Sequence, residues 1–251
     1  MNKFSLLFLL ILVSSCYSLK KVSYLQSEEN VLAIPNNPII YLVQPNDILN
    51  IRVQSLDPEQ SAFFNISSTE NSRIQANDAS LFLSGYSVNQ DGNISLPIVG
   101  EIKVSGLTVE AIRELIQDEI NKYLLDAIVI VKLTSYKISV LGDVGRPGTN
   151  FVYNNQATIF EALSAAGDAN ISANRRNIRL IRQIGGKSYV IKMDLTDPKI
   201  IESPYYFLLP NDVIYVETSK ENLFRNNLVL ITVTFTAIST GLLILNFVQT
   251  N

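Results

Sequence analysis

The hydrophobic and polar positions of this chain leave two apolar ends around a mixed middle. At the C-terminal end, residues 226–251 contain no Lys, Arg, Asp or Glu. Within them, the twenty-one residues from Leu228 to Val248 would form a helix about 31 Å long. Because this length matches the thickness of a hydrocarbon core, the pattern predicts a membrane-spanning helix over residues 222–251.

The polar residues of this predicted helix gather on one side. At about 100° per residue, the hydroxyl and amide positions fall together and the Leu and Val positions lie mostly elsewhere. The polar positions on this side are Thr232, Thr236, Ser239, Thr240 and Asn246, and only Thr234 lies clearly off it. A polar face in lipid favours contact with other helices or with water, so these five residues are candidates for lining a pore or contacting a helix. The alternative is a plain anchor whose hydroxyls bond to carbonyls of their own helix.

The N-terminal end has the pattern of an export signal. Lys3 precedes an apolar run over residues 4–13, which is too short to span a membrane, and two serines precede Cys16. This end resembles the lipobox of bacterial lipoproteins, in which the cysteine is acylated. We therefore expect a signal peptide over residues 1–15, lipidation of Cys16, and a tether over residues 16–38.

The middle of the chain predicts two small domains. For residues 39–136, the alternation and the turn residues predict a strand, a hairpin, a helix and a strand. The first strand is expected at 48–53. The hairpin is expected at 86–97 with a type I′ turn at Asp91-Gly92, and its strand continues to 104. The helix is expected at 109–125 with Thr108 as N-cap, and the last strand at 127–133. This order predicts an α+β domain.

Residues 137–217 predict a second β-rich domain with one short helix. A strand at 137–142 ends in a Gly/Pro turn, and Thr158 with Glu161 forms a capping box that opens a helix to Ala166. A hairpin about Gly185-Gly186 follows. The sequence Pro-Asn-Asp precedes a strand twice, at 45–47 and at 210–212, which suggests two related modules.

Composition narrows the chemistry available to the chain. It has no His, one Cys and a formal net charge of −3. A His base, a Cys–His pair and a Cys/His zinc site are therefore excluded, and we predict no catalytic residue, metal or cofactor. The net negative charge argues against a nucleic-acid partner. Three arginines, Arg175, Arg176 and Arg179, are interpreted as solvated surface.

Several motifs together resemble the polysaccharide export lipoproteins of Gram-negative bacteria, the Wza-like family. The motifs similar to the export domain are Pro45-Asn46-Asp47, Gly85-Tyr86, Asp91-Gly92, Leu96-Pro97, Gly100 and Gly106-Leu107-Thr108. Those similar to a soluble-ligand-binding β-grasp (SLBB) domain are Gly142-Asp143-Val144, Pro147-Gly148 and Ala165-Ala166-Gly167. Asn46 and Asn211 stand where the family usually has Gly, and Asp168 stands where a second Gly is common.

The resemblance implies an α+β fold with an export domain at 39–136, an SLBB domain at 137–217 and a C-terminal transmembrane helix. It further implies a homo-oligomeric ring in the periplasm, held to the outer membrane by lipid, whose C-terminal helices form a pore for capsular or extracellular polysaccharide. The expected inner-membrane partner is a polysaccharide co-polymerase, often coupled to a tyrosine kinase. Two other interpretations stand beside the translocon. One is a membrane-tethered sugar-binding or scaffolding lipoprotein without a pore, and the other, disfavoured by the lack of His, is a carbohydrate-processing enzyme.

Overall fold

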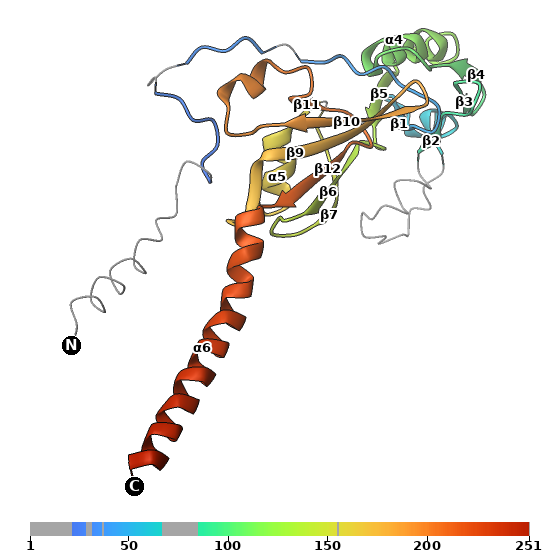
Figure 1. Cartoon of the computed structure of the whole chain (residues 1–251). Helices are drawn as coiled ribbons and strands as arrows, with labels where there is room; N and C mark the ends of the chain where they lie inside the picture. Colours follow the sequence, from blue (N-terminus) through green and yellow to red (C-terminus); the bar gives the residue numbers. More distant parts are fainter. Residues whose placement is uncertain (1–21, 29–31, 37, 67–84, 155, 251) are drawn as a thin grey trace.

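The computed structural model describes residues 22–28, 32–36, 38–66, 85–154 and 156–250, without the side chains of 220–231 and 250 (Figure 1). The predicted signal peptide and Cys16 lie outside the described residues. The elements of the first half are β1 (Ile48–Gln54), α2 (Pro58–Ala62), β2 (Tyr86–Ser87), β3 (Asn93–Leu96), β4 (Gly100–Lys103), α4 (Val109–Ile120) and β5 (Ile128–Leu133). Those of the second half are β6 (Lys137–Gly142), β7 (Gly148–Phe151), β8 (Ala157–Thr158), α5 (Ile159–Ala165), β9 (Ala173–Ile184), β10 (Lys187–Met193), the 3-10 helix η2 (Pro198–Glu202), β11 (Phe207–Leu208), β12 (Val213–Thr218) and α6 (Lys220–Thr250).

The first hydrophobic core lies between α4 and a three-stranded antiparallel sheet of order β2-β1-β5. Thr108 caps α4 as predicted, because its side chain accepts a hydrogen bond from the Ala111 amide. Ile112, Ile116 and Ile120 follow at four-residue spacing and are fully buried. The helix ends at Ile120, earlier than the predicted 125.

The predicted hairpin at 86–97 is wrong in its pairing. Residues 89–92 do turn, and the Gly92 amide bonds to the Asn89 carbonyl at 2.9 Å, but β2 pairs with β1 and not with β3. Strand β3 instead pairs with β4 around a turn at 97–99, inside the segment expected to continue as strand. Gly92 has φ 79° while Asp91 is not among the positive-φ residues, so the turn is not type I′, which needs positive φ at both central positions.

The second core lies between α5 and one face of a five-stranded sheet of order β10-β9-β12-β6-β7. Strands β12 and β6 are parallel, and the other neighbours are antiparallel. The capping box of Thr158 and Glu161 is present, and Gly167 follows α5 with φ 75°. The predicted hairpin about Gly185-Gly186 is confirmed as β9 and β10.

The last strand of this sheet leads directly into α6, which extends away from both cores (Figure 1). At about 1.5 Å per residue, the 31 residues of α6 make it about 46 Å long. The strand order of the sheet thus determines where this helix leaves the folded part of the chain.

Candidate functional site

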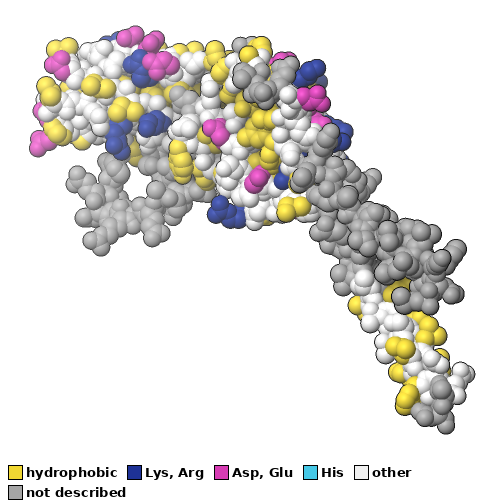
Figure 2. Space-filling view, turned by 90° about the vertical axis from the view of Figure 1, so that its left-hand side faces the viewer, with side chains coloured by type: hydrophobic (Ala, Val, Ile, Leu, Met, Phe, Trp, Pro, Cys, Tyr) yellow, Lys and Arg dark blue, Asp and Glu magenta, His cyan; other side chains and the backbone are white. Residues whose placement is uncertain are grey.

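The described part of α6 exposes nearly all of its apolar side chains. The span from Thr232 to Gln249 has a mean hydropathy of 1.4, with none of its residues buried, and passes the length and composition test for a membrane span. On the face drawn in Figure 2, hydrophobic side chains alternate with uncharged polar ones and no charged side chain is coloured there. So large an exposed apolar surface on a folded chain indicates an interaction with lipid or with other helices.

The predicted polar residues of α6 are brought together within an arc of about 120°. Three of their hydroxyls donate to carbonyls of the same helix: Thr236 Oγ1 to Thr232 at 2.7 Å, Ser239 Oγ to Thr236 at 2.9 Å, and Thr240 Oγ1 to Thr236 at 2.8 Å. This is the bonding expected of a plain anchor in the single chain. Each hydroxyl oxygen still has acceptor capacity and is exposed, so it can also bond outward.

A shallow groove overlaps one edge of the hydroxyl stripe. It is lined by Thr232, Val233, Thr236, Ala237, Thr240, Gly241 and Ile244. Small residues at four-residue spacing let two membrane helices approach closely. A Cβ built on Gly241 would meet no atom within 4 Å, so nothing in the single chain requires glycine there.

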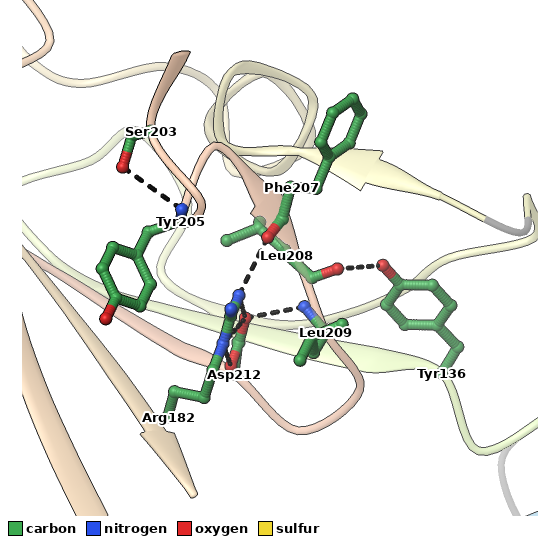
Figure 3. Close-up of polar contacts among 8 residues, drawn as sticks. All are labelled: Tyr136, Arg182, Ser203, Tyr205, Phe207, Leu208, Leu209 and Asp212. Atoms are coloured by element: carbon green, nitrogen blue, oxygen red, sulfur yellow. Dashed lines mark hydrogen bonds and ion pairs between the residues drawn. The ribbon is translucent and has the colours of Figure 1, made fainter. Parts of the chain in front are cut away.

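A buried ion pair supports the strand that leads into α6 (Figure 3). Arg182 on β9 and Asp212 before β12 are 3% and 1% exposed, and Arg182 Nη2 lies 2.7 Å from Asp212 Oδ2. Arg182 also donates to the Phe207 carbonyl at 2.9 Å, and the Leu209 amide donates to Asp212 at 2.7 Å. Burial raises the pKa of the Asp212 carboxyl, and the hydrogen bonds from Arg182 and Leu209 oppose that rise.

The Pro-Asn-Asp turn before β1 has the same local geometry with different partners. The Gln44 amide donates to Asp47 Oδ2 at 2.9 Å, matching the bond from Leu209 to Asp212. Asp47 is 3% exposed but accepts hydrogen bonds from the Tyr41 and Ser135 hydroxyls. Burial, and next the charge of Asp47, raise the pKa of Tyr41.

The arginines interpreted from the sequence as surface divide in the structure. Arg175 is 5% exposed and donates to the Asn170 and Ala169 carbonyls, so that interpretation is wrong for Arg175. Arg179 is exposed and pairs with Glu217 at 2.5 Å. The sequence pattern alone marks neither Arg175 nor Arg182 as buried. Arg175 binds backbone carbonyls, which no residue type signals, and the partners of Arg182 lie 25 and 30 residues away. Among the described residues, no group of three or more His, Cys, Asp or Glu could hold a metal.

Two segments of the chain match known protein families. Residues 35–134 match the family described as polysaccharide biosynthesis/export protein, and residues 136–216 match the SLBB domain. The EPS I polysaccharide export outer membrane protein EpsA of Ralstonia solanacearum is 32% identical over 142 residues, which are 55% of this chain and 37% of that protein. The protein of the same name from Ralstonia nicotianae is 31% identical over 144 residues, 56% of this chain and 37% of that protein.

The matched segment spans well under half of these relatives. Polysaccharide export proteins are transport proteins, which agrees with the prediction that the chain is not an enzyme. With two consecutive family matches over residues 35–216, the chain belongs to the polysaccharide biosynthesis/export proteins, with an export domain followed by an SLBB domain in the Wza-like manner.

Proposed function

We propose that the chain is a subunit of an outer-membrane translocon that exports capsular or extracellular polysaccharide. The relatives named as polysaccharide export outer membrane proteins support the substrate class and the location. In this proposal the domain boundary lies at 136/137 and the second domain is a β-grasp. Acylated Cys16 lies in the outer membrane, the globular domains lie in the periplasm, and an inner-membrane co-polymerase with a tyrosine kinase delivers the polymer.

The observation that carries the proposal is the two-sided surface of α6. None of the residues of its apolar span is buried in the single chain. Five of its polar side chains form one stripe, and the groove overlaps one edge of that stripe at Thr232, Thr236 and Thr240. Several copies packed in a ring through Ala237 and Gly241, on the side of the groove away from the stripe, would place the stripe on a water-filled lumen and the Leu, Val and Phe side chains against lipid. Neutral hydroxyls suit a sugar polymer, because they exchange hydrogen bonds with it without a fixed charge.

One observation favours the second candidate, a tethered scaffold without a pore. The hydroxyls of Thr236, Ser239 and Thr240 already donate within their own helix, so a lone α6 is a satisfied anchor. The two functions differ in whether the stripe meets water and in which membrane the helix crosses.

The membrane that α6 crosses can be tested by labelling Asn251→Cys on intact cells with a membrane-impermeant maleimide. The translocon predicts labelling on intact cells, because the C-terminus then lies outside. Labelling only after the outer membrane is breached, or only after both membranes are lysed, would leave the scaffold.

The lumen itself can be tested by a matched pair of cysteines at nearly the same depth. Thr236→Cys lies on the stripe, and Ile238→Cys lies about 200° around the helix. A small hydrophilic thiol reagent added to cells is expected to label Thr236→Cys and to leave Ile238→Cys unlabelled. Equal protection of both positions would refute the lumen.

A further inference from the structure

The tether that follows Cys16 is docked on the second domain in the described residues. The Leu25 amide donates to the Leu195 carbonyl at 3.1 Å, and the Gln26 amide donates to the Thr196 carbonyl at 2.8 Å. These two bonds fix the direction of the chain next to Tyr24.

The Tyr24 side chain makes the specific contacts of this docking. Its ring packs edge-on against Phe160 with centroids 5.5 Å apart, and the Arg175 guanidinium lies 5.0 Å from its centroid. Its hydroxyl donates to Asp168 Oδ1 at 2.5 Å. Asp168 has φ 64°, a conformation that side chains rarely adopt, and its carboxylate is held there by Tyr24 and by the Ala169 amide. We call Tyr24, Phe160, Asp168 and Arg175 the tether clamp.

The tether clamp shares a loop with the base of α6. Arg175 binds the Ala169 and Asn170 carbonyls on one side of this loop. The Ser219 amide, one residue before α6 begins, donates to the Ser172 carbonyl at 2.8 Å on the other side. Thr218 also pairs with Ala173. In Figure 1, the described start of the tether accordingly lies close to the start of α6.

Chain length then limits where Cys16 can lie. Tyr24 is eight Cα-to-Cα steps from Cys16, a reach of at most about 28 Å. The apolar stretch from Leu228 to Val248 begins eight residues into α6, about 12 Å from its base, and its far end lies about 42 Å from the base. An anchor at Cys16 can therefore reach the near face of the span and cannot reach the far face.

We propose that the tether clamp couples the lipid anchor to the base of α6, so that acylated Cys16 and α6 enter the same face of one membrane side by side. This rests on the proposed acylation of Cys16 and on the proposed span of α6. The clamp excludes an arrangement in which the lipid lies in the outer membrane and the helix in the inner one. A tether released from the clamp would be held only by the membrane at Cys16 and by the chain near residue 38, so Ser23 would sample distances on the order of 20 Å.

The experiment measures distances between spin labels in the full-length, acylated protein in vesicles of phosphatidylethanolamine and phosphatidylglycerol. One pair joins Ser23→Cys to Tyr153→Cys. Tyr153 is exposed and lies beyond the Lys137 end of β6, whereas the base of α6 lies near its Gly142 end. The control pair joins Ile171→Cys, in the loop that the clamp and the helix share, to the same Tyr153→Cys. The Ser23 pair should give one narrow distance, which Tyr24→Phe retains and Tyr24→Ala broadens to a spread on the order of 20 Å. The control pair should stay narrow in all three proteins, which shows that the domain remains folded.

A second readout uses a lipid with a nickel-chelating headgroup, which speeds the relaxation of labels close to the membrane surface. The label at Ser23 should respond, and the label at Tyr153 should not. A Ser23 pair that is broad in the parent, or narrow in Tyr24→Ala, would overturn the clamp, and a Ser23 label indifferent to nickel would overturn the shared membrane face. Label uptake by the parent chain without added cysteines would instead overturn the acylation, so the two failures are distinct.

Discussion

Arg182 and Asp212 allow a quantitative test of what supports the strand that continues into α6. Both side chains are almost completely buried, and three hydrogen bonds join them, at 2.7, 3.0 and 3.2 Å. Truncating one partner leaves the other as an uncompensated charge, which costs about 3–5 kcal/mol. We therefore expect Arg182→Met to lower the free energy of unfolding of the second domain by about 3–5 kcal/mol.

Removing both charges should cost much less than the sum of the two single changes. In the double variant Arg182→Met with Asp212→Asn, the asparagine oxygen can still accept the Leu209 amide, which now bonds to Asp212 at 2.7 Å. The Phe207 carbonyl loses its bond from Arg182, a loss of about 1–3 kcal/mol. Two single losses of about 3–5 kcal/mol each would sum to about 6–10 kcal/mol. The double variant is therefore expected to lose several kcal/mol less than this sum.

The assay is urea unfolding of the full chain in mild detergent, followed by the near-ultraviolet circular dichroism of tyrosine. The chain has 11 Tyr and no Trp, so this signal reports the packing of its tyrosines. Arg179→Met is the matched control, because Arg179 lies on β9 like Arg182 and pairs with Glu217 on the adjacent strand β12, but its side chain is 45% exposed. The control should cost less than about 1 kcal/mol. A loss in Arg182→Met no greater than that in Arg179→Met would refute the reasoning.

Four further changes have expected outcomes. Gly241→Leu should leave the thermal unfolding of the globular part unchanged, since a Cβ there meets nothing, but should abolish chemical cross-linking between copies in the membrane. Thr158→Ala removes the capping box of α5 and should lower stability to urea by about 1 kcal/mol. Asn211 has φ 67°, so Asn211→Val should destabilise by about 1–2 kcal/mol while Asn211→Gly should not, as differential scanning calorimetry would show. Burial and then the bond to Asp168 raise the pKa of Tyr24 to about 12. The clamp should therefore hold fully below pH 10 and release as the pH rises through about 12. Limited proteolysis of the tether should become faster over this pH range in the parent, with no such step in Tyr24→Phe.

Short-range signals in the sequence predicted most of the elements correctly. The caps at Thr108 and Thr158 and the glycine turn at 185–186 each depend on residues within a few positions, and the structure has all three. The predicted hairpin at Asp91-Gly92 was wrong because nearby residues determine the turn but do not determine which strands pair. β2 finds its partner in β1, and β3 finds its partner in the strand that follows.

The contacts of the tether clamp and of the buried ion pair could not be predicted from the sequence, because they also join residues far apart in the chain. Tyr24 and Asp168 are separated by 144 residues, and Arg182 and Asp212 by 30. The composition marks these residues only as polar, and polar residues are exposed by default. Asp168 did depart from the family pattern, in which Gly is common, and in the structure this residue accepts the Tyr24 hydroxyl.

The two Pro-Asn-Asp turns show how far one local signal extends. In both, an Asn adopts positive φ and the Asp accepts the amide three residues earlier, so the same letters give the same turn and start a strand. The second side of each carboxylate differs: Asp47 meets the neutral hydroxyls of Tyr41 and Ser135, whereas Asp212 meets the charged Arg182. Both carboxylates accept hydrogen bonds, but only Asp212 has an opposite charge beside it, and separating that buried pair would leave two uncompensated charges. The turn with the charge pair thus lies before β12, the strand that joins α6 to the folded domains. The turn without an opposite charge lies before β1, which ends at Gln54, far from α6.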